Sequence, residues 1–392
     1  MERDAETEPR TLDKKINIDM EKIQIFCENT SSIHECLPGT KLSELSEILD
    51  HKCKYRPLCA IVDNLLKDLN FELYTSHIIK FLDMSHPEGR RTYVKSLSFL
   101  FQRSVIELFP EYKVTYKYNL PNGLYGEIVG HTLTEDELRA IKGKMIEYIK
   151  ADIPFQKKKL PKFVATSIFK SNDQPAKASL AEYSKKYFIS VYYLDGYADN
   201  FYGPLVKSTG CLDLFDIALY SDGFYLQAPS TFEPWKVAEY KYQDKLNHIF
   251  KENADWNEKL GIDTLAKLNK AVSSGASIPI IQIAEALHER KYAEIADRLY
   301  QERNRIKLVL IAGPSSSGKT TTSNRLAIQC ITLGLHPIVL EMDNYFVDRE
   351  KTPKDENGEY DFESIYAMDL DFLNEQLNDI MDGKEVELPK FD

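Results

Sequence analysis

The sequence predicts a chain of several domains that combines α+β and α/β folds. Its 392 residues exceed one ordinary domain, so we expect two to four compact units. In the first part, short apolar runs alternate with turn-forming residues, which indicates strands. Near the end, a continuous apolar run stops at a glycine and a helical pattern follows, which is typical of a buried parallel strand that leads into a helix. We therefore divide the chain into four parts: 15–84, 85–234, 235–305 and 306–392.

The first part, residues 15–84, is expected to be rich in strands. Its apolar runs are "KIQIFCE", "PLCAIVDN" and "HIIKFLDM", and turn formers such as "LPGT" separate them. The stretch "KLSELSEIL" has helical spacing instead. These patterns predict a small β-rich domain with one helix.

The second part, residues 85–234, mixes helices and strands. Apolar residues recur at helical spacing in "YVKSLSFLFQRSVIELF". The stretch "TLTEDELRAIKGKMIEYIKADIP" predicts another helix, with Thr132 or Thr134 as its N-cap, acidic residues in its first turn and Pro154 after its end. The third part, 235–305, is charged and poor in Gly and Pro, so we expect a helical connector.

Composition narrows the kinds of protein that this chain can be. A formal net charge of −11 argues against a surface that binds nucleic acid everywhere, although Lys157–Lys159 is either a local RNA contact or an ordinary solvated face. The sequence has no apolar stretch of membrane-spanning length, and the charged start "MERDAETEPR" has no signal-peptide core. We therefore expect a cytoplasmic protein without a membrane partner, and this composition is compatible with a homo-oligomer.

The six cysteines are expected to be reduced thiols. They stand at positions 27, 36, 53, 59, 211 and 330, without a C-x-x-C pair or a matching histidine spacing. That pattern favours buried free thiols over disulfides or a zinc site.

The fourth part, residues 306–392, contains a phosphate-binding motif. The run "RIKLVLIAG" predicts a strand, and "KTTTSNRLAIQCITLG" predicts a helix that ends at Gly334. The loop between them satisfies G-x-x-x-x-G-K-[ST] in the strand–loop–helix context that the motif requires. We expect Lys319 to reach the β- and γ-phosphates of ATP and Thr320 to bind Mg²⁺. The nucleotide-binding residues predicted here are Gly313, Pro314, Ser315, Ser316, Ser317, Gly318, Lys319, Thr320 and Thr321.

A second strand is predicted in "HPIVLEMDNYF". Its apolar core at Ile338–Leu340 would bring Asp343 to the carboxyl end of a parallel sheet, beside the phosphate loop. A carboxylate there could accept the proton of an attacking hydroxyl group. The alternative is a turn aspartate that only caps the end of the strand.

These stretches resemble the uridine kinase branch of the phosphoribulokinase and uridine kinase family. The resemblance includes "GPSSSGKTTTSNRL", "EMDNYF" and "YDFESIYAMDLDFLNEQLNDIMDGKEVELPKFD". It implies Asp343 as general base, Lys319 as a catalytic group, and Glu363 and Phe391 as contacts to the ribose and base of a nucleoside, a pyrimidine by the same resemblance. Ser364, Ile365 and Phe346 depart from the family pattern, as does the length of the Glu363 side chain. The departures leave the base preference open.

Residues 18–230 resemble a different family, the threonyl-tRNA synthetases. "KIQIFCENTSSIHECLPGTKLSELSEIL" and the sequence up to "FLDMSHPEGRRTYVKSLSFLFQRSVIELFP" look like a β-grasp TGS domain and the start of an editing domain, and "YADNFYGPLVKSTGCLDLFDI" looks like that domain's C-x-G-P-H segment. The family's three histidines and one cysteine correspond here to Lys95, Phe99, Phe201 and Leu205. Because these side chains offer no water-activating set, we expect no hydrolytic editing.

Together the two resemblances predict an ATP-dependent nucleoside kinase. The synthetase-like part, 15–234, would be a regulatory, tRNA-binding or RNA-binding module, and residues 306–392 would be an incomplete P-loop domain that is inactive by itself. The alternative is a non-enzymatic protein in which a nucleotide-sensing loop controls an RNA-binding module.

Overall fold

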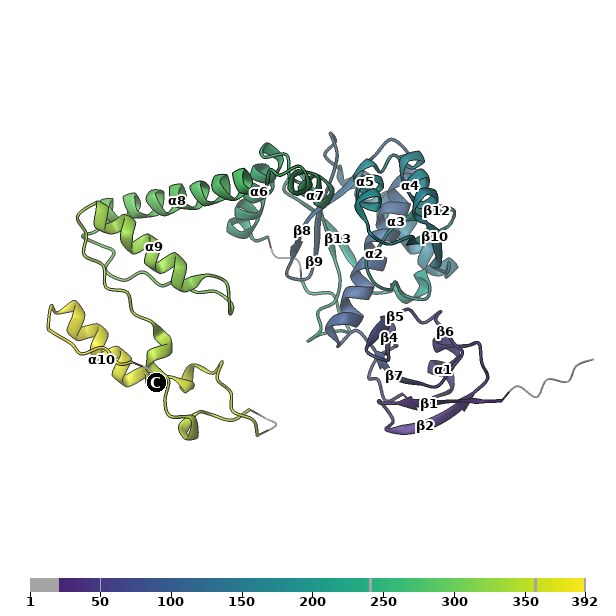
Figure 1. Cartoon of the computed structure of the whole chain (residues 1–392), viewed down its shortest axis with the longest axis horizontal. Coiled ribbons are helices and arrows are strands. Elements are labelled where there is room, and N and C mark those ends of the chain that lie inside the picture. Colours follow the sequence, from purple (N-terminus) through teal and green to yellow (C-terminus); the bar gives the residue numbers. More distant parts are fainter. Residues whose placement is uncertain (1–20, 50, 240–241, 356–357, 391–392) are drawn as a thin grey trace, which may run out of the picture. The chain divides into compact units, whose positions relative to one another are not determined.

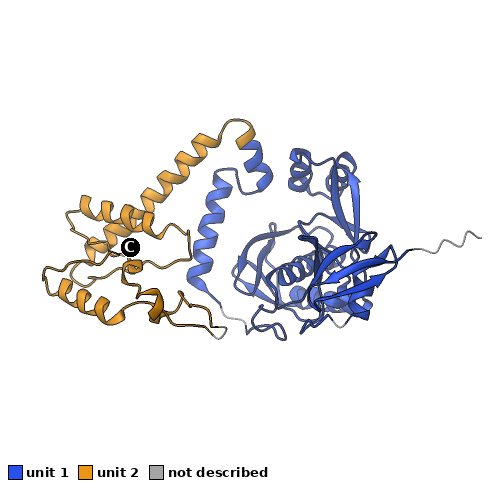
Figure 2. Cartoon of the chain, turned by 60° about the horizontal axis from the view of Figure 1, so that its bottom comes forward, with its two compact units in different colours: residues 1–271 blue, residues 272–392 orange. Residues whose placement is uncertain are grey.

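The computed structural model describes residues 21–49, 51–239, 242–355 and 358–390. The chain divides into two compact units, unit 1 (residues 1–271) and unit 2 (residues 272–392), coloured blue and orange in Figure 2. Unit 1 is a mixed α+β structure with several sheets, as the sequence predicts (Figure 1). The division at 271/272 falls inside the segment that we expected to be one helical connector.

Unit 1 begins with the expected strand-rich region around one helix. A five-stranded sheet has the order β2-β1-β7-β4-β5, in which β1 and β7 run parallel and the other pairs run antiparallel. The helix α1 (Leu42–Ile48) buries Leu42 and Leu45 in the core beneath this sheet. The strands are β1 (Ile23–Cys27), β2 (Ser32–Cys36), β3 (Thr40–Lys41), β4 (Cys59–Val62), β5 (Leu65–Lys67), β6 (Glu72–Leu73) and β7 (His77–Leu82).

The rest of unit 1 is built around two long helices and two sheets. Helix α2 (Pro87–Leu108) and helix α3 (Glu135–Ala151) supply much of a large core. Thr134, one of the two predicted caps, begins α3: its hydroxyl accepts a hydrogen bond from the Glu137 N–H, and the Glu137 carboxylate accepts one from the Thr134 N–H. A four-stranded sheet with the order β13-β14-β9-β8 contains β8 (Val114–Leu120), β9 (Gly123–Ile128), β13 (Asp216–Tyr220) and β14 (Gly223–Gln227).

The second sheet of this region has three strands in the order β10-β11-β12. They are β10 (Gln156–Pro161), β11 (Phe188–Leu194) and β12 (Tyr197–Asp199), all antiparallel. Helices α4 (Lys162–Ser171) and α5 (Pro175–Tyr183) pack on one face of it, around the buried side chains of Phe169 and Val191. Its other face contributes Tyr192 to the large core of unit 1.

The expected connector is helical but is not one element. Helix α6 (Asp244–Lys259) is part of unit 1 and packs on its four-stranded sheet, where Phe250 stacks on Tyr118 of β8 with ring centroids 4.8 Å apart. Helix α7 (Leu265–Ser273) follows, and helix α8 (Ser277–Gln301) belongs to unit 2.

Unit 2 contains α8, the predicted helix α9 (Lys319–Thr332) and a third helix, α10 (Leu370–Met381). Ala296 of α8 packs against Leu326 and Cys330 of α9 in a small core. Gly334, with φ of +81°, follows α9 as expected, because its left-handed backbone ends a helix without steric cost. Asp369 caps α10 by accepting a hydrogen bond from the Phe372 N–H at 3.0 Å.

The two strands predicted in unit 2 are not formed. Residues 306–313 and 335–341 have no regular secondary structure, and Leu310 is 78% exposed. A parallel strand needs neighbours to bind its backbone N–H and C=O groups. Among the described residues of unit 2, strand pairing is limited to two isolated bridges, Phe346 with Met368 and Lys354 with Tyr360. The expected parallel sheet is therefore wrong for this structure.

The cysteines can be compared with the prediction of buried free thiols: Cys27, Cys59 and Cys330 are buried, whereas Cys36, Cys53 and Cys211 are partly exposed. All six cysteines are free, and no group of His, Cys, Asp and Glu side chains within the described ranges could hold a metal ion. Among those same residues, no helix is long and apolar enough to cross a membrane.

Candidate functional site

The four positions that the sequence singled out in unit 1 come together in space. Lys95 and Phe99 lie one turn apart on α2, and Phe201 and Leu205 lie on the segment that follows β12. The rings of Phe99 and Phe201 have centroids 5.0 Å apart, and Leu205 is fully buried. The Lys95 ammonium group donates a hydrogen bond to the Tyr202 carbonyl oxygen at 2.8 Å. The two pairs of positions lie about 100 residues apart in the sequence.

Aromatic side chains fill the centre of this region. Phe99 lies 5.9 Å from Phe155 and 6.3 Å from Tyr197, measured between ring centroids. We call Phe99, Phe155, Tyr197 and Phe201 the aromatic cluster. Packed aromatic rings stabilise a core but cannot bind a metal ion or take a proton from water. Burial lowers the pKa of Lys95, and its ammonium group is already bound to a backbone carbonyl.

A buried ion pair that the sequence did not predict supports the aromatic cluster. The Asp199 carboxylate is fully buried and accepts hydrogen bonds from the Lys177 ammonium group and, at 2.6 Å, from the Asn200 N–H. Burial raises the pKa of Asp199, and Lys177 opposes that shift. The Lys177 ammonium group also lies 5.6 Å from the centre of the Phe201 ring. The pair therefore joins α5 to the end of β12 and fixes the segment that positions Phe201.

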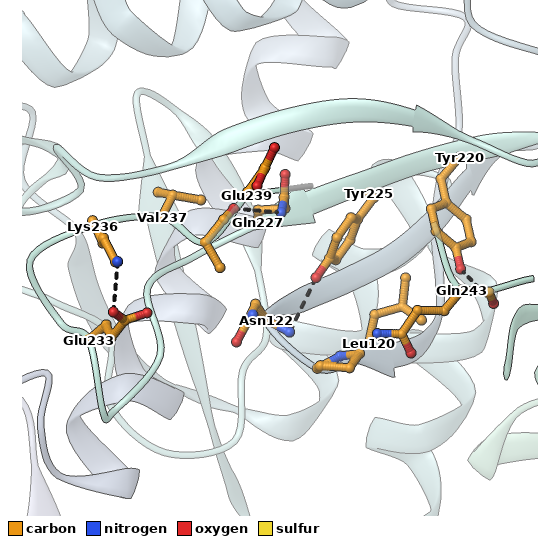
Figure 3. Close-up of a pocket in the computed structure, with 12 residues that line it drawn as sticks. Leu120, Asn122, Tyr220, Tyr225, Gln227, Glu233, Lys236, Val237, Glu239 and Gln243 are labelled. Carbon is orange, nitrogen blue, oxygen red and sulfur yellow. Dashed lines mark hydrogen bonds and ion pairs between the residues drawn. The ribbon is translucent and has the colours of Figure 1, made fainter. Parts of the chain in front are cut away.

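Unit 1 also contains an open pocket of about 580 Å³ that no sequence motif indicates. Figure 3 shows Tyr220 and Tyr225, from β13 and β14, pointing their hydroxyl groups into it. The Tyr225 hydroxyl accepts a hydrogen bond from the Asn122 N–H at 3.2 Å, and the Tyr220 hydroxyl donates one to the Gln243 carbonyl at 3.3 Å. The pocket is polar, but its tyrosine hydroxyls are already used within the protein.

The loop before α9 is a tight turn that leads directly into the helix. Ser316 has φ of +59° and Gly318 has φ of +85°, so both adopt the left-handed backbone of a tight turn. Helix α9 begins directly at Lys319 without a side-chain cap, so its first N–H groups are open to an anion. The Lys319 ammonium group donates to the carbonyl oxygens of Gly313 (2.9 Å) and Pro314 (3.1 Å). The lysine thus lies over the loop.

The other residues predicted for this site lie elsewhere or outside the described part. Asp343 is exposed in a short 3₁₀ helix, Met342–Tyr345, and not at the end of a strand, because the strand is absent. Glu363 is exposed, and its N–H donates to the Asp361 carboxylate at 3.1 Å. Phe391 lies outside the described residues. Within the described part of unit 2, no hydrogen bond or ion pair joins Asp343 or Glu363 to the loop, and their individual roles stay predictions.

Comparison with known proteins finds threonine–tRNA ligases that are similar to part of this chain. The chain is 30% identical over 172 residues to a threonine–tRNA ligase of Chlorobaculum tepidum, which is 43% of this chain and 26% of that protein. It is 26% identical over 189 residues to a threonine–tRNA ligase of Syntrophomonas wolfei, covering 48% of this chain and 30% of that protein. A probable cytoplasmic threonine–tRNA ligase of Enterocytozoon bieneusi is 27% identical over 191 residues, which is 48% of this chain and 29% of that protein.

The matches thus span less than a third of the length of these ligases. No protein-family profile matches the chain. The comparisons support the resemblance of part of the chain to threonyl-tRNA synthetases.

The comparisons also correct the predicted activity. We expected an ATP-dependent nucleoside kinase, but the relatives named above are tRNA ligases. The prediction of a kinase, with a nucleoside as its substrate, is therefore wrong. A short phosphate-binding motif is shared by many proteins of different activity, so the motif in 313–320 was weaker support for a specific reaction than for a bound phosphate.

Proposed function

We propose that unit 1 is a tRNA-binding region, related to part of the threonine–tRNA ligases, that does not hydrolyse aminoacyl-tRNA. The observation that supports this most is the aromatic cluster, since Phe99 and Phe201 occupy the positions where the resemblance calls for a histidine and a cysteine. The rings pack together at 5.0 Å, and neither ring can act as an acid or a base for water activation. The name of the relative from Enterocytozoon bieneusi supports a cytoplasmic location.

A pocket between the strand-rich region and the rest of unit 1 supports contact with an anionic partner. It has a volume of about 610 Å³, and its lining includes Lys54, Arg56 and Lys207 as well as Glu47 and Asp152. Lys207 is paired with Glu47 at 3.1 Å, so the contact with an anion is assigned to Lys54 and Arg56. The Arg56 guanidinium group donates to the Gly210 carbonyl oxygen at 3.0 Å, and it forms no ion pair with a carboxylate among the described residues. The Lys54 ammonium group lies over the rings of Tyr55 and Trp235. Cations held in a pocket in this way are suited to phosphate groups of RNA.

Binding of a labelled tRNA to the full chain, measured by fluorescence anisotropy, tests the proposal. We expect saturable binding that weakens with salt, because phosphate contacts release counterions. Replacing Lys54 and Arg56 together by Ala should weaken it about tenfold or more. The matched control is Lys80→Ala, which removes an exposed lysine that is paired with Glu28 in the strand-rich region. Absence of tRNA binding by the parent chain would contradict the proposal.

We also propose that the loop Gly313–Thr321 binds the phosphates of a nucleoside triphosphate. Its support is the left-handed backbone at Ser316 and Gly318, the uncapped start of α9 and the position of Lys319 over the loop. In this proposal the N–H groups of the loop and of the first turn of α9 donate to phosphate oxygens, and Lys319 moves from the loop carbonyls to the phosphates. The Thr320 hydroxyl would hold Mg²⁺, which neutralises phosphate charge when bound. Isothermal titration with MgATP tests this.

A further inference from the structure

Three aromatic side chains of unit 1 gather on the surface where β11 begins beside the start of α4. Pro161 is paired with Phe188 in the β10–β11 register, and the Lys162 N–H donates to the Tyr187 carbonyl at 2.9 Å, so the two chain segments are adjacent. The exposed fractions are 71% for Phe163, 72% for Tyr187 and 53% for Phe188. The rings of Tyr187 and Phe188 contact edge to face at 5.0 Å. Adjacent aromatic rings with this exposure are typical of a binding surface.

Lysines surround these rings. Lys185 and Lys186 directly precede Tyr187, and both are exposed. Lys159 lies two residues before Pro161 on the edge strand β10, so its side chain is on the same face of the sheet as Phe188. None of these three lysines forms an ion pair with a carboxylate in the described part of the chain, whereas Lys157 is paired with Asp68 at 2.9 Å. We call Lys159, Phe163, Lys185, Lys186, Tyr187 and Phe188 the aromatic–lysine patch.

The composition of the patch indicates the chemistry of its partner. The chain has a net charge of −11, so a local group of unpaired lysines attracts a polyanion against the average charge of the molecule. Exposed rings beside lysines match the way in which proteins hold single-stranded nucleic acid: bases stack on the rings and phosphates lie on the cations. A duplex offers the same phosphates but keeps its base faces stacked inside, so it cannot use the rings.

We propose that the aromatic–lysine patch binds a single-stranded stretch of RNA, with bases stacked on Tyr187 and Phe188 and phosphates held by Lys159, Lys185 and Lys186. This inference rests on the proposed function, RNA binding by unit 1, and names a surface and a mode of contact for it. It assigns the patch to an unpaired loop or end of the RNA and not to a helical stem.

Binding of three labelled probes to the full chain tests the inference: a short uridine oligonucleotide, the same strand annealed to its complement, and a tRNA. The double variant Tyr187→Ala/Phe188→Ala should bind the oligonucleotide more weakly by about twenty-fivefold or more, since the loss of each stacked base weakens binding about fivefold or more. Binding of the duplex should not change. Replacing Lys185 and Lys186 by Ala should reduce the slope of log affinity against log salt by about one for each phosphate contact removed. Phe232→Ala is the matched control, because Phe232 is exposed and lies outside the patch.

The outcomes separate this inference from the proposed function. If the double variant binds the oligonucleotide as tightly as the parent chain, the inference is wrong even when tRNA binding persists. An equal loss for oligonucleotide and duplex would also overturn it, because the rings would then serve no stacking role. The parent chain could also bind no oligonucleotide but form dimers that the double variant does not form. In that case the patch is a self-association surface and the inference is wrong. If the parent binds the oligonucleotide through Tyr187 and Phe188 but binds no tRNA, the inference stands and the proposed function fails.

Discussion

The segment Phe201–Leu205 of unit 1 and the loop Gly313–Thr321 of unit 2 both occupy the place of a known functional motif, and they differ in opposite ways. The first has a complete scaffold: Leu205 is buried, Phe201 packs on Phe99, and Lys95 binds the Tyr202 carbonyl. It lacks the chemical groups. The second keeps its chemical groups, but the strand expected before it is not formed. The comparison teaches that the residues of a motif and the scaffold that positions them are separate features, and each needs its own test.

The largest effect, a loss of stability, is expected in the aromatic cluster of unit 1. Phe99→Ala should destabilise unit 1 by about 3–5 kcal/mol, because removing a fully buried ring leaves a cavity that a core fills only in part. Urea denaturation followed by circular dichroism measures the loss. Tyr202→Ala, at an exposed position of the same segment, should cost less than about 0.5 kcal/mol. Equal costs for the two variants would show that the aromatic cluster is not a packed core.

In the loop Gly313–Thr321, we expect a substitution to lower the affinity for MgATP and to leave the fold intact. Lys319→Ala should weaken MgATP binding by about 2–3 kcal/mol, or roughly a hundredfold, since the lysine supplies charge-assisted hydrogen bonds to phosphate. Because the Lys319 ammonium group is exposed and donates to two loop carbonyls, the circular dichroism spectrum should not change. Titration calorimetry of parent and variant makes the comparison, with Lys307→Ala as a control for loss of a lysine near the loop. A variant that binds MgATP as well as the parent chain would refute the phosphate-binding loop.

Low pH should destabilise the fold of unit 1, because the Glu137 carboxylate becomes protonated. Hydrogen bonds from the Thr134 N–H, the Tyr112 hydroxyl and His131 lower the pKa of this carboxylate from its usual value of 4.5 to about 2. A lowered pKa means that its stabilising contribution is complete above pH 4.5 and is lost as the pH falls toward 2. Glu137→Gln should therefore cost about 1–2 kcal/mol near neutral pH, the scale of a helix cap, and the cost should shrink between pH 4.5 and 2. A cost that does not change with pH would contradict this assignment.

The smallest effect is expected at the contact between α8 and α9. The Arg325 guanidinium group forms an ion pair with the Glu289 carboxylate, which also accepts a hydrogen bond from Gln329 at 3.0 Å. Because both charged side chains are partly exposed, Glu289→Gln should cost at most about 1 kcal/mol and should lose that effect in high salt. Thermal unfolding at low and high salt measures it. A large, salt-independent loss would mean that this pair is essential to the helix packing of unit 2.

The sequence was most informative where local rules decide the structure. The cap at Thr134 and the end of α9 at Gly334 follow from backbone preferences that neighbouring residues determine. Juxtaposition of Phe99 and Phe201 was predictable only through the resemblance, because periodicity does not say which helix meets which segment. The run 306–313 has the composition of a buried strand, yet a strand also needs partners, which composition cannot report.

Two other features of unit 1 could not be predicted because no sequence pattern marks them. The pairing of Lys177 with Asp199 depends on how α5 packs against β12, and neither residue belongs to a motif. The aromatic–lysine patch joins residues from two segments, 159–163 and 185–188, that become neighbours only through the β10–β11 register. The kinase prediction failed for the opposite reason, since a local motif was taken to specify a whole activity.

The most direct test of the central claim is a deacylation assay on the full chain with tRNA(Thr) mischarged with serine, the substrate that the resemblance to an editing domain implies. The assay is run at a protein concentration where tRNA binding has been measured. The account predicts that the tRNA is bound and that ester hydrolysis stays at the rate in buffer. Phe99, Phe201 and Leu205 are apolar side chains that cannot activate water, and the Lys95 ammonium group is bound to the Tyr202 carbonyl oxygen. Hydrolysis clearly above the buffer rate that is lost in a Lys95→Ala variant would contradict it.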